Sequence, residues 1–391
     1  MKITVMGAGR IGRGYLTYLL LLNECEITYF DMDKVVDELN RVGSYEIHVL
    51  GDATKNRVHD TYKAYYLNDN ESLEKSLKES DFLFTAAGGK NMRSVGETIG
   101  KALRKVLKSD HILNIVTCEN WVDPAKDLRA GIESQLNEEE LKKLHENVGI
   151  SESVIVATGT GSPDGKEPAN PMDTWIQDIR YLPVDNGRLV GNLPKWEGFE
   201  AVEHFGKLLT QKLYTNNTSC TAMSYIGLRY GYTYLCDACN DEYLETILDE
   251  LYKEINIALI DGMGIDRESQ LAFSRRAKQK YTDRNIIDPM TRIARDPVRK
   301  LKPQDRFIMP ARLALKAGYR PWAIARGAAA ALFYYQEGDE SAGQLKELRE
   351  KYGIEYILKN ICGLDENEEL YGLILEQVDW LKKEGLVSNE V

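Results

Sequence analysis

Residues 212–220 (KLYTNNTSC) combine side chains that could support oxidation of an alcohol. At about 100° per residue, a helix would bring Lys212, Asn217 and Cys220 within an arc of roughly 140°, so that they could converge on one ligand. A lysine whose pKa is lowered by burial or a nearby cation can accept a hydroxyl proton, and an asparagine amide can donate to the oxygen. Oxidation by such a pair also needs a hydride acceptor, which must be bound by another part of the chain. The alternative is that Lys212 lies on a solvated helix face and Asn217 caps a helix.

A loop that could bind such an acceptor lies near the start of the sequence. Residues 2–6 (KITVM) predict a short apolar strand, and three closely spaced glycines follow it before a predicted helix over 13–22. In the dinucleotide-binding fingerprint, the glycines allow a tight turn, approach of a pyrophosphate and close helix packing, and the helix N-terminus attracts the phosphates. The cofactor-binding residues predicted in this loop are Gly7, Gly9, Arg10, Ile11 and Gly12.

Two further strand ends carry cofactor candidates. A strand over 26–31 ends in Asp31, at the spacing of about 20 residues where an acid binds the adenosine ribose. Its carboxylate should repel a 2′-phosphate, which favours NAD over NADP, although Lys34 is close enough to weaken the preference. A strand over 81–87 ends in Gly88, which either lets the backbone approach the cofactor or forms a tight turn.

The strand predicted over 111–116 ends in Thr-Cys-Glu-Asn. Ligands of parallel sheets bind beyond the carboxyl ends of the strands, so Asn120 is expected beside the nicotinamide. Asn120 is therefore a candidate both for cofactor binding and as a second amide donor to the reacting oxygen. Glu119 could orient Lys212 or relay its proton, or it could pair with a nearby cation.

Domain organisation follows from a change in periodicity. Strand and helix patterns alternate at first, with an inserted hairpin expected over 44–66 and a strand over 154–157, whereas helical spacing dominates after Phe199. We predict an α/β fold class, with a Rossmann-type dinucleotide-binding domain over 1–195 and an all-helical domain over 196–391.

One basic cluster is a candidate anion site. Arg292, Arg295 and Arg299 stand at i, i+3 and i+7, and Lys300 follows them. On one helix these guanidinium groups would share a face and could bind a phosphate or a carboxylate. A solvated, internally paired face would explain the same charges, since three aspartates are near in sequence: Asp288, Asp296 and Asp305.

The net charge, the apolar runs and the spacing of possible metal ligands disfavour several classes of protein. The 391-residue chain has a net charge of −11, which makes nucleic acid and anionic membranes unfavourable partners. No apolar run approaches the roughly 20 residues of a membrane span, and no signal peptide opens the chain, so we expect a cytoplasmic protein. The five histidines show no ligand spacing, and Cys236 and Cys239 are expected to be buried thiols, so no catalytic metal is predicted.

Six stretches resemble the polyol-specific long-chain dehydrogenase family, in the family's order across nearly the whole chain. They are residues 7–14, 44–49, 113–120, 212–217, 296–301 with 305–306, and 327–330. The resemblance implies metal-independent use of NAD or NADP in the reversible oxidation of a secondary alcohol on a polyol or its phosphate. We expect a monomer or a small homo-oligomer. It implies Lys212 as general base, with Asn120 and Asn217 holding the substrate oxygen.

Two departures from the family concern the substrate. The family has a histidine where this chain has Cys220, a weaker hydrogen-bond partner, and a Val-Asp-Arg-Ile-Val-Pro motif of its phosphate-acting members is absent.

We expect interconversion of a polyol or polyol phosphate with its ketose. The alternatives are reduction of a sugar acid (a keto-uronate) and a nucleotide-binding homologue without turnover. The predicted substrate-binding residues are Cys220, Arg292, Arg295, Arg299 and Lys300.

Overall fold

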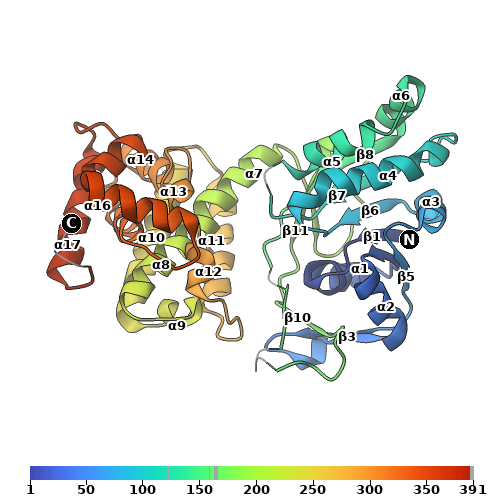
Figure 1. The fold of residues 1–391 in the computed structure, drawn as a ribbon, viewed down its shortest axis with the longest axis horizontal. Helices are drawn as coiled ribbons and strands as arrows, with labels where there is room; N and C mark the ends of the chain where they lie inside the picture. Colours follow the sequence, from blue (N-terminus) through green and yellow to red (C-terminus); the bar gives the residue numbers. More distant parts are fainter. Residues whose placement is uncertain (122, 158, 163–165, 388–391) are drawn as a thin grey trace. The chain divides into compact units, whose positions relative to one another are not determined.

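The computed structural model describes residues 1–121, 123–157, 159–162 and 166–387 (Figure 1). The chain divides into two compact units, Met1–Phe205 and Gly206–Val391. The sequence placed the boundary between residues 195 and 196. Strand β12 (Phe199–Val202) pairs with β11 (Leu182–Asp185), and this pairing joins the residues after 195 to the first unit.

A sheet of six parallel strands forms the centre of the first unit. Its spatial order is β5 (Lys63–Tyr66), β2 (Glu26–Asp31), β1 (Lys2–Met6), β6 (Phe82–Thr85), β7 (Leu113–Thr117) and β8 (Val148–Glu152). The order reverses between β1 and β6, and in doubly wound sheets the ligand binds at the carboxyl ends of the strands beside this reversal. The predicted Rossmann-type fold is confirmed.

Core residues alternate between the two faces of this sheet. Val5 and Phe84 belong to one buried cluster, and their chain neighbours Met6 and Leu83 belong to another. The first cluster includes residues of the helices after β1 and β2, and the second includes residues of the helices after β5, β6 and β7. These helices are α1 (Thr17–Leu22), α2 (Asp33–Val42), α3 (Asn70–Glu79), α4 (Met92–Val106), α5 (Pro124–Glu133) and α6 (Glu138–Asn147) (Figure 1).

Two strand predictions in this unit need correction. The hairpin predicted over 44–66 is shorter, because β3 (Tyr45–Val49) pairs with β4 (Arg57–His59) while β5 joins the central sheet. The strand predicted over 154–157 is wrong, since the sixth strand is β8. A glycine and polar residues weaken the strand pattern of β8. Tertiary packing requires the glycine, because a Cβ on Gly149 would lie 2.1 Å from Oδ1 of Asn114. A second sheet contains β3, β4, β9 (Gly159–Thr160) and β10 (Thr174–Ile176).

The second unit is helical, as predicted. Its centre is the apolar helix α15 (Trp322–Leu332). This helix approaches α8 (Thr218–Arg229) so closely that a Cβ on Gly327 would lie 2.6 Å from Cβ of Ala222. The helices are α7 (Phe205–Lys212), α8 (Thr218–Arg229), α9 (Leu235–Cys239), α10 (Glu242–Ile260), α11 (Arg267–Thr282), α12 (Met290–Ala294), α13 (Pro297–Lys300), α14 (Ile308–Lys316), α15 (Trp322–Leu332), α16 (Glu340–Asn360) and α17 (Glu369–Lys383). Within the described residues, no helix combines the length and the apolar character needed to cross a membrane.

Candidate functional site

In the glycine-rich loop after β1, only the second of the three glycines has free space where a side chain would begin. Gly7 has φ +101°, and a Cβ there would lie 2.5 Å from the Ala86 backbone. A Cβ on Gly12 would lie 1.9 Å from the Gly7 oxygen, whereas a Cβ on Gly9 would meet no atom within 4 Å. The first and third glycines are therefore required by the chain's own packing, and the second leaves space for a ligand. This pattern fits a dinucleotide phosphate.

The helix after this loop begins earlier than predicted and in a different form. A π-helix, η1 (Arg10–Leu16), precedes α1, and Arg10 is exposed while Ile11 is half-buried. The Thr17 hydroxyl donates to the Gly12 oxygen at 2.8 Å, which reinforces the wide turn. Short π-helical segments are frequent at functional sites. Arg10 and Ile11 therefore lie at the accessible start of η1.

Asp31 forms a hydrogen bond with the backbone of the glycine-rich loop. Its Oδ2 accepts a hydrogen bond from the Ala8 N–H at 2.5 Å, and its Oδ1 accepts one from the Met32 N–H at 2.6 Å. A carboxylate has about four acceptor positions, so these contacts leave room for ribose hydroxyls. The sequence indicated the ribose role and missed the contact with the loop.

The loops after β6 and β7 are tied together by Glu119. Its two carboxylate oxygens accept hydrogen bonds from the N–H groups of Ala87 at 2.9 Å and Gly88 at 3.0 Å. Burial raises the pKa of Glu119, and these hydrogen bonds oppose the rise. The structure thus gives Glu119 a backbone-binding role that the sequence did not indicate. Gly88 has φ +88°, so the turn itself favours glycine.

Asn120 is exposed in the loop that follows β7. Beside it, the Trp121 side chain covers Gly89, where an added Cβ would lie 2.3 Å from Cβ of Trp121. The Trp121 indole also donates to Asp127 at 3.2 Å. Trp121 and Glu119 therefore fix both sides of Asn120 against neighbouring elements. Sequence reasoning missed Trp121, since a single exposed tryptophan carries no spacing signal.

In the second unit, the predicted lysine-containing stretch is helical but not uniformly α-helical. Lys212 ends α7, the π-helix η5 (Leu213–Asn217) follows, and α8 begins at Thr218. A π-helix closes wider turns than an α-helix, so the predicted 140° arc does not apply. Lys212, Asn217 and Cys220 are all half-buried, which leaves each partly accessible to a small ligand.

The environment of Lys212 suits a proton acceptor. Burial lowers the pKa of Lys212 from 10.5 to about 8; Cys220 raises it and Arg306 lowers it further. Arg306 is itself buried, and its guanidinium donates to Asp305 at 2.7 Å and to Thr221 at 3.3 Å. A substantial fraction of the Lys212 amine is therefore neutral in mildly alkaline solution.

The predicted arginine face is not one helix. Helix α12 ends at Ala294, Asp296 has φ +61°, and Pro297 begins α13. A residue before proline disfavours the helical conformation, and the Asp-Pro pair was a signal in the sequence for this break. Arg295 is exposed at the end of α12.

The neighbouring basic residues are held by the protein itself. Arg292 pairs with Asp288 at 2.5 Å and Arg299 with Asp296 at 2.6 Å, as the internally paired alternative expected. Lys300 is buried, and its Nζ donates to the backbone oxygens of Ile293 and Arg295 at the end of α12. Burial lowers its pKa to about 7. Lys300 therefore stabilises the break in the chain, and it is fully charged only below about pH 7.

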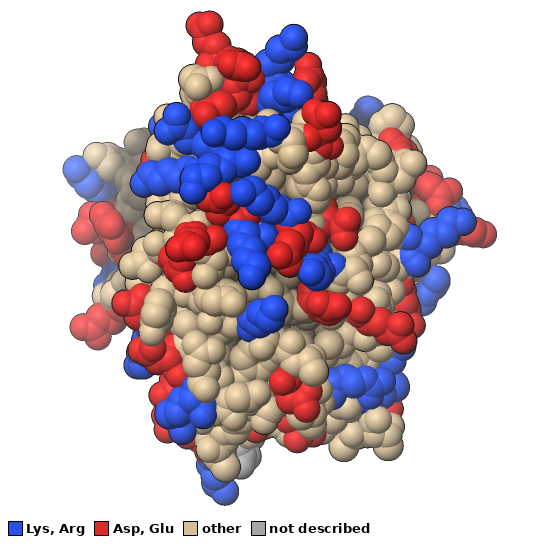
Figure 2. All heavy atoms as spheres, turned by 90° about the vertical axis from the view of Figure 1, so that its right-hand side faces the viewer, with Lys and Arg blue, Asp and Glu red and all other residues tan. Residues whose placement is uncertain are grey.

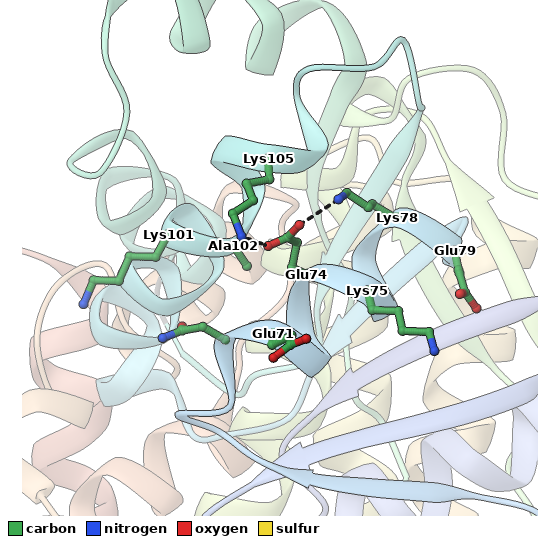
Figure 3. Close-up of a pocket in the computed structure, with 9 residues that line it drawn as sticks. Glu71, Glu74, Lys75, Lys78, Glu79, Lys101, Ala102 and Lys105 are labelled. Atoms are coloured by element: carbon green, nitrogen blue, oxygen red, sulfur yellow. Dashed lines mark hydrogen bonds and ion pairs between the residues drawn. The ribbon is translucent and has the colours of Figure 1, made fainter.

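A separate groove lies between α3 and α4, with a volume of about 690 Å³ (Figure 3). Glu74 pairs there with Lys78 at 2.7 Å and with Lys105 at 2.6 Å. Basic and acidic side chains also intermingle across this face of the first unit (Figure 2). None of the predicted cofactor- or substrate-binding residues lines the groove, so its size does not make it the reaction site.

The described residues contain no group of three or more His, Cys, Asp or Glu side chains arranged to hold a metal ion. Cys236 and Cys239 are buried free thiols on α9, as predicted.

Family models match both units. Residues 1–198 match the mannitol dehydrogenase Rossmann domain, and residues 204–382 match the mannitol dehydrogenase C-terminal domain. The mannitol-1-phosphate 5-dehydrogenase of Thermoanaerobacter pseudethanolicus is 28% identical over 386 residues, covering 98% of each chain. The enzyme of the same name from Bacillus pumilus is 30% identical over 382 residues, covering 96% of this chain and 99% of the relative.

Solved structures share the fold. Substrate-free D-sorbitol dehydrogenase superposes with a TM-score of 0.77 at 15% identity, covering 98% of this chain and 93% of that one. Mannitol 2-dehydrogenase of Pseudomonas fluorescens, in a ternary complex with NAD and D-mannitol, superposes with a TM-score of 0.71 at 14% identity, covering 99% and 92%.

Proposed function

Because this chain belongs to the mannitol dehydrogenase family, we propose that it is an NAD-dependent oxidoreductase that interconverts a polyol phosphate with the matching ketose phosphate. The observation that carries the proposal is the half-buried Lys212, with a pKa lowered to about 8 beside further cations. Relatives covering nearly the whole chain are named mannitol-1-phosphate 5-dehydrogenases, which supports a phosphorylated substrate.

The glycine-rich loop would hold the cofactor. The space beside Gly9 accommodates a pyrophosphate, the start of η1 at Arg10 and Ile11 faces it, and Asp31 accepts hydrogen bonds from the ribose. A 2′-phosphate would meet the negative charge of Asp31, so NAD is favoured over NADP. Bound NAD supplies the hydride acceptor for the oxidation.

Proton transfer and oxygen binding are assigned to three residues. The neutral amine of Lys212 accepts the proton of the substrate hydroxyl, while the amides of Asn120 and Asn217 donate hydrogen bonds to the same oxygen. These bonds strengthen as negative charge develops on the oxygen, which lowers the barrier. In the reverse direction, protonated Lys212 returns the proton to the alkoxide.

Positive charge would select the substrate. Arg306 acts electrostatically on Lys212, and Arg292 and Arg299 lie on α12 and α13. These guanidinium groups supply the lasting positive charge, since the lowered pKa values of Lys280 and Lys300, about 8 and about 7, leave their amines mostly neutral in alkaline solution. Such a cluster favours an anionic sugar over a neutral one. A keto-uronate would satisfy the same charges, so a sugar-acid reductase is the second candidate function.

A substrate screen tests the proposal. Polyols, polyol phosphates and aldonates should be assayed with NAD and with NADP at alkaline pH, and ketoses, ketose phosphates and keto-uronates with NADH. We expect turnover with a polyol phosphate and NAD. Turnover confined to sugar acids would favour the second candidate. NAD binding with no turnover on any of these compounds would contradict both and leave a nucleotide-binding homologue.

A further inference from the structure

Two consecutive backbone oxygens of η1 are bound by hydroxyl groups from different elements. The Thr17 hydroxyl on α1 donates to the Gly12 oxygen at 2.8 Å, and the Tyr45 hydroxyl on β3 donates to the Arg13 oxygen at 2.8 Å. Between them, the Tyr29 hydroxyl on β2 lies 2.5 Å from the hydroxyl of Thr17 and 2.8 Å from that of Tyr45. We call these three groups the hydroxyl chain. It connects the glycine-rich loop to the second sheet, which contains β3.

The number of protons decides which members of the hydroxyl chain hold the backbone. Each hydroxyl has one proton to donate. The protons of Thr17 and Tyr45 go to the two backbone oxygens, so Tyr29 can donate to only one of its two neighbours. Thr17 and Tyr45 therefore bind η1 directly, and Tyr29 supports one of them.

The hydroxyl chain is closed to water. Thr17 and Tyr29 are 0% exposed, and Tyr45 is 1% exposed. The ring of His59 packs edge-on against the rings of Tyr29 and Tyr45. Burial lowers the pKa of His59 to about 4, so this neighbour is neutral at physiological pH. Hydrogen bonds are stronger in such surroundings, and water is poorly placed to replace a lost hydroxyl.

The backbone of Arg13 closes the turn that faces the space beside Gly9. The Arg13 N–H donates to the Gly9 oxygen at 2.9 Å, while the Arg13 oxygen is bound by Tyr45. Residues 10–12 lie between these two points and begin the helix, so their N–H groups have no partner within it. In a dinucleotide-binding fold, such N–H groups bind the phosphates. A shift of the Arg13 backbone would therefore displace the donors to the phosphates.

We propose that Tyr45 is a positioning residue for the cofactor: its hydroxyl fixes the backbone of Arg13 and thereby the turn whose N–H groups bind the pyrophosphate. Thr17 has the same role at the oxygen of Gly12. This inference rests on the proposed function, because it takes the glycine-rich loop to bind NAD. It extends the cofactor site to a strand that lies outside the six-stranded sheet.

The test measures NADH affinity of the full-length protein by fluorescence titration and stability by denaturant unfolding. Tyr45→Phe keeps the ring and removes the hydroxyl, so the NADH dissociation constant should rise roughly fivefold, as expected for the loss of one buried hydrogen bond. The KM for NAD should rise by a similar factor, whereas kcat at saturating NAD and the KM for the alcohol should stay unchanged. Thr17→Val removes the neighbouring hydrogen bond with little change in shape. It should also weaken NADH binding, and it replaces Tyr45→Phe if that variant does not fold.

Tyr62→Phe is the matched control in the same aromatic cluster. The centre of its ring lies 5.6 Å from that of Tyr45 and 5.7 Å from that of Tyr29, but its hydroxyl donates to the Leu39 oxygen on α2 at 2.7 Å. It should lose a similar amount of stability and keep its NADH affinity. An unchanged dissociation constant in Tyr45→Phe, or in Thr17→Val where Tyr45→Phe does not fold, would overturn the proposal. An equal rise in Tyr62→Phe would also overturn it.

The same measurements separate this inference from the proposed function. If the unsubstituted protein does not bind NADH, the proposed function fails, and the inference fails with it. If the unsubstituted protein binds NADH and turns over a polyol phosphate, and Tyr45→Phe does so equally well, only the positioning role fails. If Tyr45→Phe lowers kcat without changing NADH affinity, the hydroxyl chain acts on the chemical step and its role in cofactor positioning is wrong.

Discussion

The two units differ in how far apart in the sequence the residues of their candidate sites lie. In the first unit, the glycine-rich loop and Asp31 lie within the first 31 residues, and one hydrogen bond from Ala8 to Asp31 joins them. In the second unit, the groups that act on the pKa of Lys212 lie as far along the chain as Arg306. Cofactor binding here is therefore a property of local sequence, whereas the basicity of the lysine is a property of tertiary packing.

The largest effect expected from this comparison is on turnover. Lys212→Ala should lower kcat by about 10²- to 10⁴-fold, the usual contribution of a general base, with the NAD dissociation constant nearly unchanged. Steady-state kinetics and NAD titration measure the two quantities. Lys207→Ala, an exposed lysine on the same helix, is the control and should have normal activity. Loss of NAD binding in Lys212→Ala would contradict the assignment of cofactor binding to the first unit and proton transfer to the second.

The next largest effects are expected at two glycines of the first unit, one on stability and the other on NAD binding. Gly12→Ala should lower the free energy of unfolding by about 3 kcal/mol, because its Cβ would overlap the Gly7 oxygen. Gly9→Ala should leave stability almost unchanged, since its Cβ meets open space, but should weaken NAD binding by about tenfold or more. Denaturant unfolding and NAD titration distinguish them. Equal destabilisation by both substitutions would contradict the structure of the loop.

A smaller effect is expected at the ribose end. Asp31→Asn should lower the NAD-to-NADP ratio of kcat/KM by roughly tenfold, because a negative charge and one of the two acceptors for backbone N–H groups are lost. Asp33→Asn removes the same charge two residues away, at the exposed start of α2, and is the control. A ratio that stays constant in Asp31→Asn, or changes equally in both variants, would count against the ribose contact.

Local pattern explains which parts of the structure could be predicted. The strand, the three glycines and the acid at the second strand end were predictable because each rule spans a few residues, and the all-helical second unit followed from apolar periodicity. The hairpin over 44–66 was extended too far because β5 finds its partner β2 in the central sheet. Alternating patterns do not specify which sheet a strand joins.

The errors at the candidate site have a similar origin. The predicted arginine face assumes uniform helical spacing, whereas the Asp296-Pro297 pair breaks the helix. The π-helical form of η5 and the burial of Arg306 beside Thr221 depend on contacts between distant segments. No spacing rule contains that information.

The central claim, that Lys212 is the general base, is tested most directly by the pH dependence of kcat/KM. Because the amine must be neutral to accept a proton in oxidation, kcat/KM should rise about tenfold per pH unit up to an apparent pKa near 8 and level off above it. Ketose reduction requires the protonated amine and should decline above the same pH. A flat oxidation profile from pH 6 to 10, with Lys212→Ala following the same curve, would contradict the account.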